Sequence, residues 1–465
     1  MKTMATFVDC VHSYLWGWPT LVFLVGTHIY MTFKTGFIQK KTFLGIKLSL
    51  KHDHDAEGDI SSFGSLATAL SATIGTGSII GVSTAIVLGG PGAVFWIILV
   101  GILGIATKYA ESLIAVKYRI KTEKGTILGG AMYALEYGLK MKWLGILFAF
   151  FGCMASFGIG STVQPNAIAT VLNKSMCVPF WVSAVIISIL VAFVIIGGIK
   201  YISKICTKLV PFMSVFYMIG CLALLIKNVN YIVPAICEII NSAFHPRAIS
   251  SGFVATTVMA AARFGIARGL FSNESGMGSA AIAAAAAKTR NPFRQALISS
   301  TGTFYTVVVC AMTGVVMVSG VLVNSGTIDA NNIDGAMLTS IVFGQLGYIG
   351  TMVLIIALIL FAFTTTIGWA YYGECCVEYL FGRKAKIPYK IIYIIMAFMG
   401  AVISLNIVWS LADIFNILMA LPNLIAILLL GTFVANETRY YSSSDNINLY
   451  EVGSDCKTIN TSSNC

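Results

Sequence analysis

The chain has 465 residues, of which 57% are hydrophobic and 11% charged, and its net charge is +11. A soluble domain carries about 45–50% apolar and about 25% charged residues, so this composition excludes an ordinary water-soluble globule. Apolar stretches of about 20 residues, long enough to cross a bilayer, recur along the sequence. They predict an all-α polytopic membrane protein with one transmembrane domain over residues 1–435 and the lipid bilayer as its main partner.

Eleven candidate membrane helices follow one another, separated by Gly, Pro and charged residues. In chain order they cover residues 14–33, 63–87, 93–116, 143–171, 180–199, 209–226, 252–287, 296–323, 346–380, 387–405 and 412–434. The odd number predicts that the two termini lie on opposite sides of the membrane.

The basic residues predict the orientation, because short cytoplasmic loops are rich in Lys and Arg. With the N-terminus outside and the C-terminus cytoplasmic, the cytoplasmic segments hold 23 of the 30 Lys and Arg and the outer segments hold four. These segments are 34–60, 117–142, 200–208, 288–294, 382–390 and the C-terminal tail. The pattern predicts a multi-pass membrane protein and accounts for the net charge without nucleic-acid binding. We expect its location to be a bacterial or archaeal cell membrane.

The composition changes at Asn436 to Ser, Asn, Thr and Asp, with almost no apolar periodicity. A segment of this kind cannot bury enough apolar surface to fold. The sequence therefore predicts a disordered cytoplasmic tail over residues 436–465.

Enzymatic function is not indicated. The 11 cysteines are scattered without metal-ligand spacing, and the five histidines lie apart from any Cys or carboxylate cluster in the apolar sequence. No Walker-type GxxxxGK[ST] motif is present, so nothing points to ATP coupling. We expect no cofactor and find no sign of an obligate protein partner.

An internal repeat is visible at an offset of 201 residues. Residues 62–81 align without gaps on residues 263–282, with identities that include Gly75/Gly276 and Gly77/Gly278. The matching predicted helices cross the membrane in opposite directions, as in secondary transporters built from inverted repeats. The prediction is a five-plus-five core, with repeats at about 62–226 and 252–434 and one extra N-terminal helix at about 14–33. Coincidence among common Gly and Ser residues is the alternative.

The paired glycine motifs, Gly75-Thr76-Gly77 and Gly276-Met277-Gly278, predict two discontinuous helices. Non-helical backbone is tolerated inside a membrane where it lines a cavity or is buried in protein, and glycine accepts conformations that other residues resist. Unwinding frees carbonyls that can bind sodium and exposes helix ends that attract a carboxylate. Close helix packing through small residues is the competing interpretation.

Several longer strings carry a family resemblance: ALSATIGTGSIIGV, GGPGAVFW, TKYAE, RFGIARGLFSNESGMGSA, AAAAAKT, IGWAYYGE and LMALPNLIA. In this order and spacing the sequence closely resembles the alanine or glycine:cation symporter family over residues 15–435. The resemblance implies import of a small neutral amino acid, alanine or glycine, by symport with sodium through alternating access.

Four positions depart from the family pattern. Ser78 stands where Asn is usual, Ala281 and Ala284 replace Pro and His, and Tyr305 lies where Asp is usual. These departures keep a second hypothesis open, a non-transporting membrane receptor or channel on the same scaffold.

Candidate binding residues cluster at the two breaks and on two further helices. For the amino acid, the residues at the breaks, Gln164 beside Pro165 in an apolar helix, and the family match together suggest Thr76, Gly77, Ser78, Gln164, Phe271, Ser272, Asn273, Gly276 and Trp369. For sodium, hydroxyls, mobile backbone and the analogy with sodium transporters suggest Thr73, Gly75, Phe361, Thr364 and Thr365. The alternatives are hydroxyls bonded to carbonyls of their own helix and, for Gln164, a purely interhelical hydrogen bond.

Charged residues inside predicted membrane helices need partners, because each costs about 2.5–3.5 kcal/mol on insertion scales. We expect Lys108 and Glu111, three residues apart, to form a structural ion pair. Glu274 lies in the second break, where we expect its carboxylate to accept hydrogen bonds from the unwound amides; a titrating role is the alternative. Arg263 and Arg268 precede that break and suggest a gate.

Overall fold

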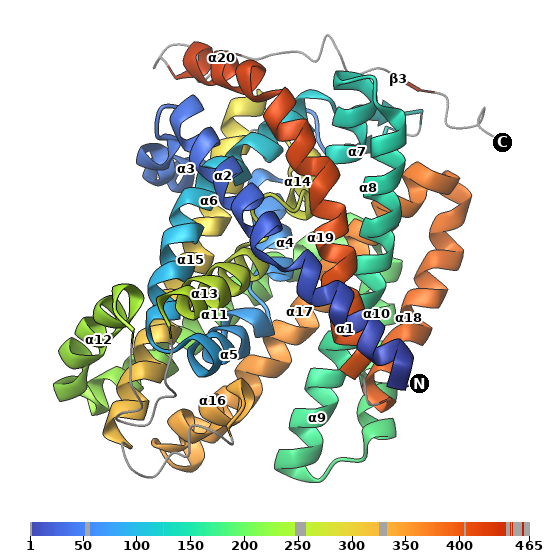
Figure 1. Ribbon diagram of the computed structural model, residues 1–465. Coiled ribbons are helices and arrows are strands. Elements are labelled where there is room, and N and C mark those ends of the chain that lie inside the picture. The colour runs from blue at the N-terminus through green and yellow to red at the C-terminus, as the bar shows by residue number, and fades with distance from the viewer. Residues whose placement is uncertain are drawn as a thin grey trace.

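The computed structural model describes residues 2–51, 56–123, 125–246, 257–324, 333–403, 406–442, 447, 449, 458 and 459. The described chain is almost entirely helical, and its helices pack side by side in one bundle (Figure 1). Its strands are short and lie in one small sheet of the order β2-β1-β3. They are β1 (Ile120–Thr122), β2 (Ile127–Leu128) and β3 (Thr458–Ile459).

The first half of the chain begins with a bent N-terminal segment and continues with the helices of the first predicted repeat. The N-terminal elements are α1 (Lys2–Leu15), α2 (Trp18–Lys34), η1 (Ile38–Lys41) and α3 (Thr42–Ser49). The following elements are α4 (Ser62–Thr73), η2 (Thr76–Ser78), α5 (Ile80–Gly89), α6 (Gly92–Lys117), α7 (Ala131–Tyr133), η3 (Ala134–Gly138), α8 (Lys142–Ala155), η4 (Ser156–Val163), α9 (Gln164–Met176), α10 (Phe180–Ile196) and α11 (Gly198–Lys227).

The second half holds two connecting elements and then the helices of the second predicted repeat. The connecting elements are η5 (Val229–Tyr231) and α12 (Ile232–Phe244). They lead to α13 (Val258–Asn273), α14 (Ser279–Ala285), α15 (Pro292–Val323), α16 (Gly335–Gly344), α17 (Tyr348–Phe381), η6 (Arg383–Ala385), α18 (Lys386–Val402), α19 (Asn406–Leu429) and α20 (Gly431–Tyr441).

Length and composition identify seven of the described helical segments as long and apolar enough to cross a membrane, or eight if the bent N-terminal pair is counted as one span. The eleven predicted spans include four outside these seven. One is the N-terminal segment, which bends by 68° between α2 and η1. Another is α10, which has 17 residues. The other two are interrupted helices, α4 with α5 and α13 with α14, whose halves are each too short to count alone.

Local sequence explains several boundaries. Ser61 caps α4 and Thr257 caps α13, each with a side-chain oxygen that accepts a hydrogen bond from a backbone amide of the first turn. Asn291 caps α15 in the same way and is followed by Pro292 at the first helical position. Pro165 follows a π-helical stretch, η4, in an otherwise continuous α8–α9 segment, as expected for a residue that removes a backbone donor.

The basic loops gather on the face that carries α20 and β3, at the top of Figure 1. Arg119 donates to the carbonyl oxygens of Ala285 and Ala287, and Lys121 forms an exposed ion pair with Glu57 at 2.8 Å. On the opposite face, Lys227 and Asn228 hydrogen-bond to Gln345. Segments predicted to share a side of the membrane therefore contact one another.

The start of the predicted disordered tail is wrong. Helix α20 continues through Tyr441, and Thr438 is buried and shares a hydrogen bond of 2.9 Å with Tyr109 on α6. Farther along, the side chain of Asn291 donates to the carbonyl oxygens of Ile447 and Leu449, and β3 pairs in parallel with β1. The polar composition at Asn436 hid a helix whose few apolar positions pack on the bundle. Most of residues 443–465 lie outside the described residues.

Candidate functional site

Both predicted helix interruptions are present, and they lie side by side. Ser65 on α4 donates to the carbonyl of Ala283 on α14 at 2.8 Å, while Ser78 at the first break shares a hydrogen bond of 2.9 Å with Ser272 on α13. The first half of one broken helix thus pairs with the second half of the other, and α5 packs against α13. The two helices run antiparallel with their breaks at the same level.

Glycine serves the two breaks differently. Gly276 and Gly278 have φ angles of +85° and +80°, which favour glycine, as the sequence predicted. Gly75, in contrast, has an ordinary extended conformation, with φ of −120°. A Cβ atom at Gly75 would lie 2.6 Å from Oγ1 of Thr365, so glycine is needed there for close approach of two helices and not for backbone freedom.

Six predicted substrate residues surround the first break. The hydroxyl of Thr76 donates to Oε1 of Gln164 at 3.2 Å, and Ser272 links Ser78 to the thiol of Cys310. A Cβ at Gly77 would lie 3.3 Å from the ring of Phe271. Thr76, Ser78, Gln164 and Ser272 are all buried. Hydroxyls, an amide and an aromatic ring from three helices therefore meet at one buried position.

The other three predicted substrate residues have different surroundings. Asn273 is buried beside α6, where a Cβ at Gly101 would lie 2.7 Å from its Nδ2, and neither polar side-chain atom has a hydrogen-bond partner among the described residues. Trp369 is fully buried against Gly160 and packs edge-on to Tyr372. The amide of Gly276 already donates to Glu111, so its N–H is not free for a ligand in this conformation.

The predicted sodium residues lie where α17 crosses α4. Thr365 donates to the carbonyl of Ser71 at 3.1 Å and lies against Gly75, while Thr364 donates to the carbonyl of Phe361 at 3.0 Å. Buried hydroxyl and carbonyl oxygens are ligands suited to a hard cation. The hydroxyl of Thr73 bonds back to Ala69 in α4, as that of Thr364 does to Phe361 in α17, and bonding within the same helix is the alternative that the sequence left open.

The second break is held by Glu111, and our assignment of this bracing role to Glu274 is wrong. Glu111 Oε2 accepts hydrogen bonds from the amides of Gly276 and Gly278, at 3.1 and 3.2 Å, and from Nδ2 of Asn423. The predicted ion pair with Lys108 is present at 3.0 Å. The Glu274 carboxylate accepts from Ser279, and its backbone carbonyl accepts from Lys108. The side chain of Glu274 therefore bonds within its own break, while Glu111 reaches the amides from α6.

Sequence reasoning missed Asn423 and His28. Nδ2 of Asn423 also donates to the carbonyl of Gly276 at 2.9 Å. His28 on α2 is fully buried, shares a hydrogen bond of 2.8 Å with Thr107, and lies against Gly276. The extra N-terminal helix therefore contacts the second break directly. A histidine inside a predicted membrane helix was the signal that could have drawn attention to it.

The arginines that precede the second break show no gate contact. Arg263 and Arg268 are partly exposed, and neither forms an ion pair within the described part of the chain. Arg263 lies over the ring of its neighbour Phe264. The gate prediction thus has no structural contact to support it.

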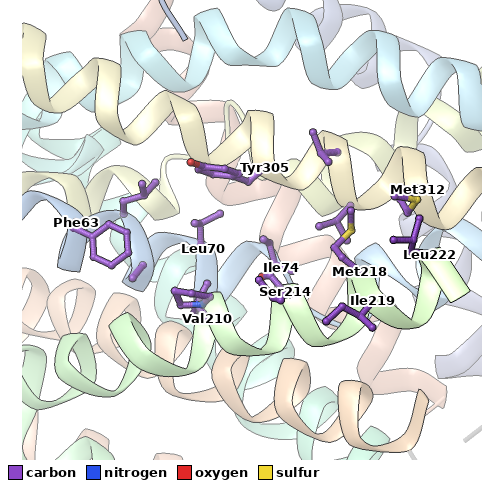
Figure 2. Close-up of a pocket in the computed structure, with 16 residues that line it drawn as sticks. Phe63, Leu70, Ile74, Val210, Ser214, Met218, Ile219, Leu222, Tyr305 and Met312 are labelled. Atoms are coloured by element: carbon purple, nitrogen blue, oxygen red, sulfur yellow. The ribbon is translucent and has the colours of Figure 1, made fainter. Parts of the chain in front are cut away.

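A separate apolar groove of about 490 Å³ lies between α4, α11 and α15. Figure 2 shows Tyr305 on one side and Val210, Met218 and Ile219 on the other. Its side chains are apolar apart from Ser214 and Tyr305, so the groove offers few partners for a zwitterion. Tyr305, one of the departures from the family pattern, faces this groove and is not among the residues that surround the first break.

Known proteins match this chain along nearly its whole length. The profile of the Sodium:alanine symporter family matches residues 1–452. The chain belongs to this family. The sodium/alanine symporter AgcS of Methanococcus maripaludis is 46% identical over 446 residues, which cover 94% of this chain and 97% of the relative. The probable sodium/glutamine symporter GlnT of Bacillus subtilis is 32% identical over 440 residues, covering 94% and 90%.

Solved structures share the fold. MhsT in complex with L-phenylalanine has a TM-score of 0.55 at 13% identity, covering 82% of this chain and 99% of the other. A Na⁺-coupled sialic acid symporter has a TM-score of 0.51 at 13% identity, covering 91% and 87%. The expected class, an all-α membrane transporter with interrupted helices, is confirmed. Membership of this family identifies the chain as a membrane transporter and not an enzyme.

Proposed function

We propose that the protein imports a small neutral amino acid, alanine or glycine, together with sodium by alternating access. The observation that carries this proposal is the meeting of two antiparallel broken helices, where Ser78 contacts Ser272 and Thr365 contacts the end of α4. The name of the M. maripaludis relative, a sodium/alanine symporter, supports alanine as the substrate.

The amino acid would bind at the first break, with Thr76, Ser78, Gln164 and Ser272 as polar partners. Phe271 and Trp369 would limit the space for the side chain, which favours a small substrate. The proposed sodium ligands are the hydroxyls of Thr364 and Thr365, the carbonyl of Phe361 and the backbone around Gly75. Thr73 remains in this set through its main chain, because its hydroxyl is bonded within α4.

The proposed architecture assigns residues 62–226 and 252–434 to two inverted repeats. The antiparallel packing of the two broken helices supports it. We also propose that the face with the basic loops and α20 is cytoplasmic, with the N-terminus outside, in the cell membrane. The clustering of Lys and Arg on that face supports this orientation.

Transport in proteoliposomes tests the proposed function. An inward sodium gradient is expected to accelerate uptake of labelled alanine, and unlabelled internal alanine is expected to accelerate it further by exchange. Exchange separates a carrier from a receptor or channel on the same scaffold. Uptake that is indifferent to sodium would contradict the coupling, and binding without exchange would favour the receptor. Glutamine belongs in the same assay because one relative is a probable sodium/glutamine symporter.

Enlarging Gly77 tests the position of the amino-acid site. Gly77→Val is expected to abolish alanine uptake. A Cβ added at Gly77 would lie 3.3 Å from the Phe271 ring, and the two methyl groups of Val need still more room. Gly81→Ala is the control, since a Cβ at Gly81 meets nothing within 4 Å. Uptake is measured at equal amounts of protein in the membrane. Normal uptake by Gly77→Val would remove Gly77 from the site.

A further inference from the structure

A second pocket, lined mainly by polar and charged residues, opens on the basic face and is separate from the residues assigned to the central site. Its volume is about 370 Å³. The walls come from the segment before α4, the β1–β2 hairpin, the α10–α11 turn, the C-terminal part of α17, η6 and the start of α18. The lining residues are Asp59, Gly125, Thr126, Leu128, Gly197, Gly198, Ile199, Lys200, Tyr371, Glu374, Cys375, Arg383 and Lys386.

The charges in this pocket are unevenly paired. Lys386 lies 2.9 Å from each of Glu374 and Glu378, so its charge is compensated. Lys200 and Arg383 are exposed and have no ion pair among the described residues. Lys390 also pairs with Glu374, at 3.2 Å, so the two glutamates are already matched by two lysines. The positive charges left for an anionic group are those of Lys200 and Arg383.

Acceptors for a positive group lie in the same pocket. Asp59 is partly buried, and its Oδ2 accepts a hydrogen bond from the amide of Ile127 at 3.0 Å. Burial raises the pKa of Asp59 above its usual range, although the Ile127 amide and the charges of Lys200 and Lys386 offset part of this effect. Cationic donors and an anionic acceptor within one small pocket match the carboxylate and ammonium groups of a zwitterion.

The pocket lies at the end of the seam between α4 and α17. Tyr371 is six residues from Thr365 on α17, about 9 Å along the helix axis. Between them, Gly368 lets the helices touch: a Cβ there would lie 2.7 Å from Oγ of Ser71 and 3.1 Å from the Cβ of Ala72. Direct contact between α4 and α17 separates the pocket from the central site, so movement of these two helices apart would join them.

We propose that this pocket is a release site that holds the transported amino acid on its way to the cytoplasm. Lys200 and Arg383 bind the carboxylate, and Asp59 accepts the ammonium group. The charges of Lys200 and Arg383 disfavour sodium as the occupant. The inference rests on the proposed function and orientation, and it adds a low-affinity site used from one side of the membrane.

The test is a comparison of the two sides. In right-side-out and inside-out membrane vesicles, sodium-driven alanine uptake gives the half-saturating alanine concentration at the outer and cytoplasmic faces. The double variant Lys200→Gln, Arg383→Gln is expected to raise the cytoplasmic value at least about fivefold and to change the outer value less than about twofold. The matched control is Lys204→Gln, Lys384→Gln, which removes two exposed basic residues that do not line the pocket.

Each outcome is decisive. An unchanged cytoplasmic value, an equal change on both sides, or the same change in the control variant would overturn the release site while leaving the proposed transport intact. Failure of the parent protein to take up alanine in either vesicle type would overturn the proposed function, and the release site with it. Asp59→Asn, which keeps an oxygen to accept from Ile127, is expected to raise the cytoplasmic value as well.

Discussion

Replacing Glu111 by alanine is expected to abolish alanine uptake and to lower the thermal midpoint of the purified protein. The carboxylate accepts two amide hydrogen bonds from the second break, a third from Asn423, and pairs with Lys108. Both partners of the pair are buried, and removing one partner of a buried pair costs about 3–5 kcal/mol. The break would lose the acceptor that holds its unwound amides.

Glu57→Ala is the matched control, because Glu57 pairs with Lys121 at a similar distance on the surface. The hydrogen bond from Lys121 lowers the pKa of Glu57, yet an exposed pair of this kind contributes only about 0–1 kcal/mol. Glu111→Gln retains one acceptor oxygen, so its alanine uptake and thermal midpoint are expected to lie between those of the parent and Glu111→Ala. A Glu111→Ala protein with parental uptake and thermal midpoint would contradict the bracing role.

Thr365→Val is expected to raise the sodium concentration for half-maximal uptake at least about tenfold, equivalent to about 1.4 kcal/mol. Valine keeps the branched shape of threonine and removes the hydroxyl that lies between the Ser71 carbonyl and Gly75. Half-saturation by alanine at high sodium is expected to change much less. The measurement is the sodium dependence of initial uptake rates.

Thr366→Val controls for the loss of a buried hydroxyl on the same helix. The Thr366 hydroxyl donates to the carbonyl of Ala362 within α17, at 3.0 Å, and forms no hydrogen bond with α4 among the described residues. Its sodium dependence is expected to match that of the parent. Equal shifts in both variants would show that the effect comes from α17 as a whole, and no shift at Thr365→Val would remove this residue from the sodium site.

The helix breaks could be predicted from sequence because their cause is partly local. Two glycine motifs in matching, oppositely directed helices were enough to locate both breaks, and the structure interrupts the helices at Gly75 and Gly276. The contact between Thr365 and the first break came from analogy with other sodium transporters. No pattern within α17 itself distinguishes Thr365 from Thr366, because only packing against α4 separates them.

Roles that depend on distant partners could not be read from sequence. Lys108 and Glu111 were visible as a pair about one helical turn apart. The amides that donate hydrogen bonds to Glu111, however, lie about 165 residues farther along the chain. The same limit hid Asn423 and His28. Helix α20 was missed because its polar surface resembles a disordered tail, while a few positions, such as Val434 and Tyr441, are buried on the bundle.

The unequal use of glycine at the two interruptions implies different mechanical behaviour. At the second, glycine accepts the left-handed backbone at Gly276 and Gly278 without strain, and Glu111 on α6 and Asn423 on α19 hold the turn by hydrogen bonds. At the first, the backbone at Gly75 is unstrained, and its shape depends on α17 lying against it. Movement of α17 would therefore free the first interruption to rewind or lengthen, whereas the second would keep its turn for as long as α6 and α19 stay in contact with it.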